Sequence, residues 1–315
     1  MKNIKSIGID FGGTSIKFGV VSGKEIVATS PSISPKDYPV ASDLIRAIAD
    51  KVEQLKSEQD NILAIGCGVP GFVNFSTGTI HNLTNVPGWV NIPLKQELEA
   101  RTGLPTAIEN DANAMAIAEW KLGAARGCDH AVCLTLGTGV GAGIIANGAI
   151  VRGAQYLAGE LGQTSIHYAG RKGNYNNPGA LEAYVGNNEF AVDTQADYAA
   201  AGIEKNLTEC TPEHLSEAAE SGCDIALKAW DDFAQKLATS LASTCWLLNP
   251  EIIVIGGGLS QAGDILFTPL MKHLHSQLSG PFKDNLKVVP AEFSNNAGIL
   301  GTAALALSEI EDYSV

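Results

Sequence analysis

The sequence predicts an α/β protein of about two domains. Short apolar runs, several ending in glycine, alternate along the chain with longer segments of helical periodicity, and this alternation is typical of the α/β class. The chain has 315 residues, which is enough for about two domains. Hydrophobic residues make up 45% of it and charged residues 17%, so a sizeable core is expected.

The first half of the chain predicts three strand regions and two helices. Apolar residues alternate over residues 6–21 around a pair of glycines, which predicts a β-hairpin. A helix is expected next, because four apolar residues recur at the spacing of one helix face: Leu44, Ile48, Val52 and Leu55. Ser42 and Asp43 are placed to cap that helix. Strands are expected at 62–69 and 104–108, followed by a helix at 112–122 that Gly123 closes.

The second half opens with a hairpin at residues 131–150, which is similar to the first in length and texture. We interpret this as a faint internal repeat, with one hairpin opening each domain. Residues 151–186 are rich in Gly, Asn and Tyr without periodicity, which is typical of a functional loop region. Helices are expected over 211–248, with Pro212 at a first helical position, then a strand at 250–256 and an apolar helix at 298–307.

Charge and hydropathy exclude several classes of partner. Lys and Arg total 21 against 34 Asp and Glu, a formal charge of −13, which argues against binding DNA, RNA or anionic membranes. No run approaches 18 apolar residues and no signal-peptide pattern opens the chain, so we expect a cytoplasmic protein without a membrane span. The six cysteines are scattered and none forms a C-x-x-C pair, which indicates reduced thiols.

The turn of the first hairpin is a candidate phosphate site, with the sequence Asp10-Phe11-Gly12-Gly13-Thr14-Ser15-Ile16-Lys17. Gly12 and Gly13 let the backbone approach phosphate oxygens where a Cβ would intrude, and Thr14 adds a hydroxyl donor. Asp10 ends a strand and is suited to hold Mg²⁺ through water. Lys17 is either a phosphate ligand or a surface charge. Taken alone, the motif also fits an ordinary glycine hairpin.

Two further glycine runs strengthen the phosphate interpretation. Gly137, Thr138 and Gly139 lie between two β-rich runs and not before a helix, so a second phosphate-binding hairpin explains them better than the turn of an NAD-dependent dehydrogenase. A third run follows a buried strand: Gly256, Gly257 and Gly258. Ligands of open α/β sheets bind at the carboxyl ends of strands, so we expect this run to face a nucleoside.

The segment Glu109-Asn110-Asp111-Ala112-Asn113-Ala114 joins a predicted strand to a predicted helix. A carboxylate near a helix N-terminus stays ionised in the field of the macrodipole. Asp111 could therefore accept the proton of an attacking hydroxyl while Asn110 orients the acceptor molecule. A simple helix cap at Asp111 is an equally good interpretation of this segment alone.

The order of these motifs closely resembles that of the ROK family (repressors, open reading frames and kinases), which has the actin/hexokinase/Hsp70-like, ribonuclease H-like fold. The motifs are D-F-G-G-T-x-x-K, G-V-P-G, N-L-x(5)-W-x(3)-P-L, E-N-D-A-N-A, G-T-G-V-G-A-G, G-E-L-G, L-E-A-Y and I-G-G-G, over about Ile7 to Ala304. The resemblance implies two α/β domains with ATP and a sugar in the cleft between them, and a homodimer. We place the domains at 1–111 and 112–297, with the helix at 298–315 packing back on the first.

The resemblance also implies roles for individual residues. Asp111 matches the family's catalytic base, which takes the proton of the sugar 6-hydroxyl as it attacks the γ-phosphate of ATP. The sugar ligands implied by position are Gly71, Asn85, Asn110, Glu160 and Glu182. The expected activity is therefore the ATP- and Mg²⁺-dependent phosphorylation of a hexose.

One departure from the family pattern concerns zinc. Family kinases typically carry a His after G-E-x-G and a C-x-C-G-x-x-G-C-x-E run, which together bind a structural zinc. Here Gln163 replaces the His and the matching run, residues 171–182, contains no cysteine. Gln is not a usual zinc ligand and thiolates are absent, so we expect no zinc. Gln163 can still donate and accept hydrogen bonds to a sugar, which leaves room for a shifted sugar preference.

The acceptor and the donor leave alternatives open. Residues 82–89 resemble the glucokinase version of the family, so glucose is the expected acceptor, with N-acetylglucosamine, N-acetylmannosamine and mannose as alternatives. A polyphosphate donor is a further option, although the acidic charge and the lack of a basic cluster near the hairpins count against it. A repressor is disfavoured because the first strand starts by Ile7. A non-catalytic sugar sensor is disfavoured by the intact Asp10, Gly12, Gly13 and Asp111.

Overall fold

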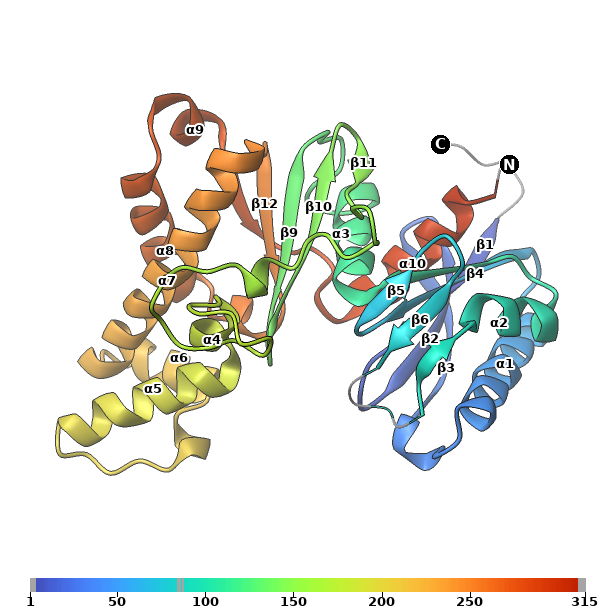
Figure 1. Ribbon diagram of the computed structural model, residues 1–315, viewed down its shortest axis with the longest axis horizontal. Coiled ribbons are helices and arrows are strands. Elements are labelled where there is room, and N and C mark those ends of the chain that lie inside the picture. The colour runs from blue at the N-terminus through green and yellow to red at the C-terminus, as the bar shows by residue number, and fades with distance from the viewer. Residues whose placement is uncertain (1–3, 84–85, 87, 311–315) are drawn as a thin grey trace. The chain divides into compact units, whose positions relative to one another are not determined.

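Two five-stranded sheets, each with its own helices, form the protein (Figure 1). The computed structural model describes residues 4–83, 86 and 88–310. The first unit comprises Met1–Gly127, Ile150–Ala158 and Glu292–Val315, and the second comprises Cys128–Ala149 and Gly159–Ala291. The boundary expected at residue 111 falls inside the first unit, because the helix that starts there packs against the C-terminal helix of that unit.

The first unit contains β1 (Lys5–Phe11), β2 (Ile16–Ser22), β3 (Glu25–Ile33), α1 (Ala41–Glu58), β4 (Ile62–Val69), β5 (Phe72–Asn74), β6 (Thr79–Asn82), β7 (Val90–Ile92), α2 (Leu94–Thr102), β8 (Thr106–Asn110), α3 (Asp111–Lys121) and α10 (Ala297–Ser308). Its main sheet has the order β3-β2-β1-β4-β8, and β5, β6 and β7 form a second, small sheet. β1 pairs antiparallel with β2, as the hairpin prediction requires, and parallel with β4, which pairs parallel with β8. The carboxyl ends of β1, β4 and β8 therefore meet at one edge.

The second unit contains β9 (Ala131–Leu136), β10 (Val140–Ala146), α4 (Glu182–Val185), α5 (Asn187–Ala200), α6 (Pro212–Glu220), α7 (Asp224–Leu248), β12 (Ile252–Gly256), α8 (Asp264–Gln277), α9 (Gly280–Asn285) and β13 (Lys287–Pro290). Its sheet has the order β11-β10-β9-β12-β13, where β11 (Ala149–Ile150) lies at the boundary of the two units. β9 and β10 form an antiparallel hairpin, and β9, β12 and β13 are parallel. Both sheets thus combine a hairpin with two parallel strands, which accounts for the repeat seen in the sequence.

Helix α1 buries the four residues that predicted it, since Leu44, Ile48, Val52 and Leu55 are fully buried. Its expected cap is wrong, however. The N-cap position is Val40, which makes no side-chain capping bond. Asp43 lies inside the first turn, where its Oδ1 accepts a hydrogen bond of 2.8 Å from Arg46 Nη2. Several polar residues near a helix start can fit the cap position in a sequence, and the helix here begins at Ala41, ahead of both candidates.

Helix α10 lies across β1 and β4 of the first unit and packs against α3. Close approach is possible because glycines line the contact: a Cβ at Gly8 or Gly66 would overlap the backbone of α10, and a Cβ at Gly301 would overlap the carbonyl of Ala114 in α3. α10 thereby positions both the end of β1 and the start of α3.

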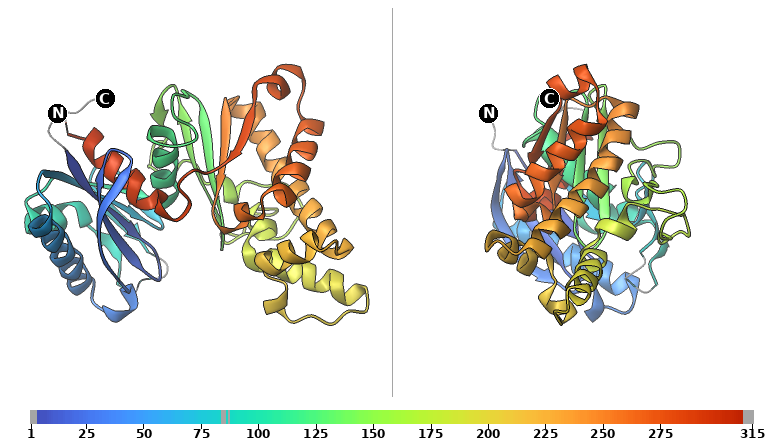
Figure 2. Two further views of the ribbon diagram at one scale, coloured as in Figure 1. Left: turned by 180° about the vertical axis from the view of Figure 1, so that it is seen from behind. Right: turned by 90° about the vertical axis from the view of Figure 1, so that its left-hand side faces the viewer.

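In the second unit, α7 and α8 run side by side (Figures 1 and 2). An aromatic cluster of Phe190, Trp230 and Phe233, with ring centroids 4.8–5.5 Å apart, joins α5 to α7 in the core. Across the described part of the chain, none of the helices has both the length and the apolar character that a membrane span needs.

Candidate active site

The carboxyl edge of the first sheet gathers polar groups from three parallel strands. Asp10 is in register with Gly68 of β4, and Gly68 with Glu109 of β8. The turn after β4 contains Gly71, whose φ of +105° favours glycine. Its carbonyl accepts a hydrogen bond of 3.2 Å from Asn110 Nδ2. The structure thus brings Asp10, Gly71, Asn110 and Asp111 to one edge of the sheet, whereas Asn85 lies outside the described residues.

Asn110 is the N-cap of α3. Its Oδ1 accepts hydrogen bonds from the backbone N–H groups of Ala112, at 2.9 Å, and Asn113, at 3.2 Å. Asp111 is the first residue of the helix, is exposed, and accepts a bond of 2.9 Å from Ala112 N at its Oδ1. The capping role that the sequence left open for Asp111 therefore belongs to Asn110. An ionised carboxylate at this first turn is favoured by the helix dipole.

A buried ion pair, which the sequence did not predict, supports this junction. Glu109 Oε2 accepts a bond of 2.8 Å from Arg152 Nε, and its Oε1 accepts bonds from Asn110 N and Asn113 Nδ2 at 2.9 and 3.1 Å. The guanidinium of Arg152 also stacks 3.5 Å from the ring centre of Phe75. Because the pair joins residues 43 positions apart, no local pattern could reveal it.

Asp10 lies at the end of β1 opposite Lys17 of β2. Burial raises the pKa of the Asp10 carboxyl, and the charge of Lys17, whose Nζ lies 3.9 Å from Asp10 Oδ2, lowers it in part. Gly298, in the first turn of α10, lies against the same carboxyl, where a Cβ would come within 2.6 Å of Asp10 Cγ. Asp10 is therefore enclosed on one side by a glycine that no motif had indicated.

The turn after Asp10 closes on itself through Gly12. Its N–H donates to the carbonyls of Ser15, at 3.0 Å, and Asp10, at 3.2 Å. The Gly12 N–H is thus occupied by the turn. Thr14 is exposed and Gly13 half-buried at its tip, so these two residues are the ones that a phosphate group could contact.

The corresponding turn of the second unit is Gly137-Thr138-Gly139. It is closed by a bond of 3.0 Å from Gly137 N to Gly139 O, and Asn187 N donates to Gly137 O at 2.9 Å. On its other side the turn meets Glu182, whose Oε2 accepts a bond of 3.0 Å from Val140 N. A Cβ at Gly139 would overlap that carboxylate. The second glycine turn is thus joined directly to a predicted sugar ligand.

The third glycine run lies beside the second. Gly257 has a φ of +87° and a Cβ there would overlap the backbone of Leu136 at the end of β9. Gly258 opens on a groove of about 640 Å³. The lining of this groove includes Asn187, Pro212, His214, Leu259 and Gln261. None of these five was predicted as a site residue, because none belongs to a motif that the sequence shows.

Glu160, Gln163 and Glu182 lie together in the second unit. Gln163 Nε2 donates to Glu182 Oε1 at 3.3 Å, and so does Asn174 Nδ2 at 2.6 Å. Partial desolvation raises the pKa of Glu160, and the nearby charge of Glu182 raises it further. The predicted ligands Glu160 and Glu182 therefore interact electrostatically. Asn174, which donates to Glu182, also belongs to this cluster of side chains.

The loop that carries these residues is held by amides and a surface ion pair. Asn177 Nδ2 donates to Gln163 O at 2.6 Å, and Gly173 is packed so closely that a Cβ would come within 2.5 Å of Ala180 Cβ and 2.7 Å of Asn177 Oδ1. Arg171 donates to both carboxylate oxygens of Asp193 at 2.8 and 3.0 Å. The loop is thus ordered without cysteines.

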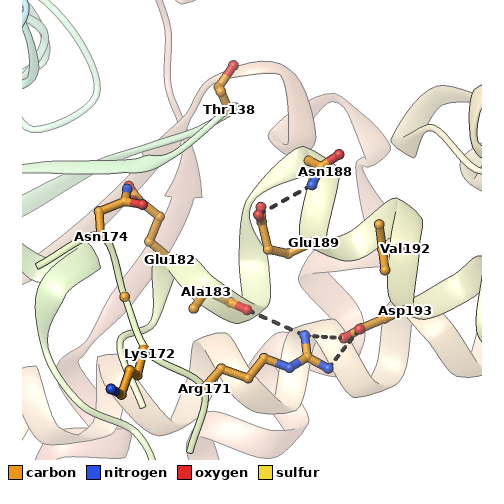
Figure 3. A pocket seen from close by; sticks show the side chains of 11 residues that line it. Thr138, Arg171, Lys172, Asn174, Glu182, Ala183, Asn188, Glu189, Val192 and Asp193 are labelled. Carbon is orange, nitrogen blue, oxygen red and sulfur yellow. Dashed lines mark hydrogen bonds and ion pairs between the residues drawn. The ribbon is translucent and has the colours of Figure 1, made fainter. Parts of the chain in front are cut away.

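A cavity of about 600 Å³ borders this loop, lined among others by Thr138, Asn174 and Glu182 (Figure 3). Asn174 and Glu182 lie next to each other in it, whereas Arg171 reaches Asp193 and Lys172 points away from Thr138. Its two basic side chains therefore form no cluster at the glycine turn. Within residues 4–83, 86 and 88–310, no three His, Cys, Asp or Glu side chains are grouped in a way that could hold a metal ion.

Comparison with known proteins agrees with this geometry. The ROK family model matches residues 6–309. A glucokinase of Thermotoga maritima is 34% identical, over 98% of this chain and 99% of its own. Two solved structures are each 30% identical to this chain. One is a ROK family glucokinase from Streptomyces griseus in complex with glucose and AMPPNP, with a TM-score of 0.79 over 96% of this chain and 99% of that one. The other is a ROK hexokinase from Thermus thermophilus, with a TM-score of 0.85 over 98% of this chain and 100% of that one. The predicted actin/hexokinase/Hsp70-like fold is confirmed, and the chain belongs to the ROK family.

Proposed function

We propose that this protein phosphorylates glucose at the 6-hydroxyl with ATP as the donor. The observation that carries the proposal is the junction of β8 and α3, where Asn110 caps the helix and leaves the Asp111 carboxylate exposed at its first turn. The glucokinase relatives and the glucose- and AMPPNP-bound relative support the choice of substrates.

In this proposal Asp111 is the general base. Its carboxylate takes the proton of the 6-hydroxyl as that oxygen attacks the γ-phosphate. The N-terminus of α3 keeps the carboxylate ionised. Asn110 uses one N–H for Gly71 O and, since an amide has two donors, has one left for a sugar hydroxyl. Gly71 would line the same sugar. The family resemblance implies this role for Asn85 too, which lies outside the described residues.

The glycine turns supply phosphate contacts. Gly13 and Thr14 of the first turn, held by Gly12, and Thr138 and Gly139 of the second, held by Gly137, would donate to phosphate oxygens. Asp10 offers the hard carboxylate oxygen that Mg²⁺ prefers, and a single carboxylate suits binding through water. When bound, Mg²⁺ would neutralise charge on the β- and γ-phosphates. Lys17, beside Asp10, would add a positive charge there.

The groove at Gly258 is the proposed nucleoside site. Of Gly256, Gly257 and Gly258, the last lines the groove and would let the backbone approach the base and ribose, whereas Gly257 packs against Leu136. Leu259 would add an apolar contact. The volume of about 640 Å³ lies in the range usual for small-molecule sites.

Glu160, Gln163 and Glu182 are the proposed sugar ligands of the second unit. Two carboxylates and an amide can accept and donate bonds to several hydroxyls of one hexose. Glucose is proposed over N-acetylhexosamines and mannose on the resemblance of residues 82–89. ATP is proposed over polyphosphate, because Arg171 is engaged by Asp193 and the two basic side chains of the cavity in Figure 3, Arg171 and Lys172, do not cluster at the turn of Gly137 to Gly139. We further propose a cytoplasmic homodimer, to be tested by light scattering.

A coupled ADP-release assay across a hexose panel, with ATP and again with polyphosphate, tests the proposal. We expect turnover with ATP, Mg²⁺ and glucose, and little with polyphosphate. ADP release that is the same without any sugar would contradict a sugar kinase. A protein that is active on no hexose with either donor would favour a sensor.

A further inference from the structure

The Glu182 carboxylate is held by three hydrogen bonds from two directions. Val140 N donates to Oε2 at 3.0 Å, while the amides of Gln163 and Asn174 both donate to Oε1, at 3.3 and 2.6 Å. Val140 belongs to β10, and the two amides belong to the loop that follows Glu160. The carboxylate is therefore fixed between the sheet and the loop.

These bonds determine how many hydrogen-bond acceptor sites of the Glu182 carboxylate remain available to a ligand. Each carboxylate oxygen has two acceptor sites. Among the residues that the structure describes, two donors from the loop fill Oε1, whereas one donor reaches Oε2 and leaves it one site. Glu182 can therefore accept one further hydrogen bond, at Oε2, and the direction of that site is set by the residues on Oε1.

We propose that Asn174 is a positioning residue for sugar binding, which orients Glu182 so that Oε2 accepts a single sugar hydroxyl. This inference rests on the proposed function and adds a specificity element to it. Asn174 bonds Glu182 more closely than Gln163 does. It is an exposed loop residue, so its removal costs little core packing.

The rest of the loop supports the placement of the two amides. Asn177 Nδ2 donates to Gln163 O at 2.6 Å, and Gly173 N donates to Asn177 O at 2.8 Å. Gly173, which adjoins Asn174, packs on Ala180 in the turn that leads into α4 and Glu182. The backbone that carries Asn174 is thus anchored independently of the Asn174 side chain.

Direct calorimetric titration with glucose, without nucleotide, tests the proposal in Asn174→Ala, Asn174→Asp and the matched control Asn176→Gly. Asn176 is an exposed amide of the same loop with a φ of +63°, which glycine adopts freely. We expect Asn174→Ala to weaken binding about tenfold, the effect of losing a bond to a charged group. The control should stay within about twofold of the wild type.

Asn174→Asp adds a second measurement, the pH dependence of glucose affinity, which damage to the loop alone would not change. It keeps the shape of the side chain but places a second carboxyl beside Glu182, and like charges at one site favour protonation of one of them. Protonated, the new carboxyl can donate to Oε1. Relative to wild type, its glucose affinity should therefore recover as the pH is lowered from about 8 to about 6. The charged groups near Glu182 are Glu160 and, in the cavity that Glu182 lines, Arg171, Lys172, Glu189 and Asp193.

A double-mutant cycle completes the test. If Asn174 acts through Glu182, Asn174→Ala should change the affinity of Glu182→Gln by less than about twofold, because the two losses are not independent. Wild-type affinity in both Asn174 variants, or full additivity in the cycle, overturns the proposal while leaving the kinase intact. A wild-type protein that binds no hexose overturns it together with the proposed function.

Discussion

The Cα atom of Gly298, in the first turn of α10, lies directly against the carboxyl group of Asp10 at the end of β1. A Cβ at position 298 would be 2.6 Å from Asp10 Cγ and 2.8 Å from its Oδ1, closer than such atoms approach in proteins. Asp10 keeps its side-chain position because residue 298 is glycine. The link joins the two ends of the chain, and it lies at the proposed phosphate end of the site.

We predict that Gly298→Ala impairs catalysis more than stability. The added methyl should displace the Asp10 carboxyl, and a misplacement of this kind can lower kcat/KM by about tenfold to a hundredfold. Alanine suits a helix better than glycine, so the Tm should change little. Gly280→Ala is the control, since nothing lies within 4 Å of a Cβ there. Equal kcat/KM in Gly298→Ala and wild type, at saturating Mg²⁺, would contradict the role given to Asp10.

Asp10→Asn should stabilise the protein while reducing its activity. Burial raises the pKa of Asp10, so the folded state binds that proton more tightly than the unfolded state, and stability falls as the pH rises through the raised pKa. The amide removes this cost at neutral pH, and the loss of the partly exposed Lys17 pair is small. A gain on the order of 1 kcal/mol would raise the Tm by about 2–4 °C.

Thermal melts of Asp10→Asn and wild type across a pH series, without Mg²⁺ or nucleotide, give the measurement. The difference should be present at neutral pH and vanish in acid, where Asp10 is protonated in both states. A lower Tm for the variant at neutral pH would show that the Lys17 pair outweighs desolvation.

Asp111→Asn should remove most turnover and leave sugar binding nearly unchanged. The amide has the same shape and can still accept a bond from Ala112 N, so α3 keeps its first turn, but it cannot accept a proton. General-base catalysis typically contributes about 10²- to 10⁴-fold, which is the expected loss in kcat. Glucose affinity, measured by titration, should stay within a few-fold of wild type. Retention of near-full kcat would remove Asp111 from the mechanism.

As the pH is lowered, the KM for glucose should begin to rise at a higher pH than it would if the titrating glutamate had an ordinary pKa. In the proposed role Glu160 would accept bonds from the sugar as a carboxylate. Its pKa is raised by desolvation and by Glu182, so it becomes protonated sooner as the pH falls. In Glu182→Gln the neighbouring charge is gone, and the rise in KM should move to more acidic pH. An unmoved pH profile in that variant would mean that another group titrates.

The loop at residues 163–182 should not depend on zinc. Gln163, Gly173 and Ala180 offer no usual zinc ligand where they converge, so a zinc chelator should leave the Tm and activity unchanged, and metal analysis should find no stoichiometric zinc. Loss of activity on chelation, restored by zinc, would overturn this expectation.

Gly173→Ala should destabilise the loop and weaken glucose binding, because its methyl would collide with Ala180 and Asn177.

Local pattern revealed the strands that are buried and the helices that are amphipathic. The hairpin formed by β1 and β2, strand β4 and helix α6 with Pro212 at its start all lie where the sequence placed them. The small sheet of β5, β6 and β7 was missed. Its strands are three or four residues long and mostly exposed or half-buried. They are too short to show the alternation of apolar and polar residues that identifies a strand in a sequence. Their pairing arises from contacts that the local sequence does not encode.

The same division holds for the candidate site. Asp10 and Asp111 were identifiable because each follows a recognisable strand or opens a helix. Arg152, Asn174 and Gly298 act on residues that a local motif does contain, but from loops and from the other end of the chain. Their roles come from tertiary contacts, and a single sequence gives no signal for such contacts.

The division of the first unit into three chain segments also bears on the order in which the protein can form during synthesis. Its sheet needs α10, residues 297–308, to cover β1 and β4, and that helix is synthesised after every residue of the second unit, which extends to Ala291. The first unit can therefore be completed only after the second has been synthesised, and until then the glycine-lined surface of β1 and β4 stays open to chaperones or to aggregation.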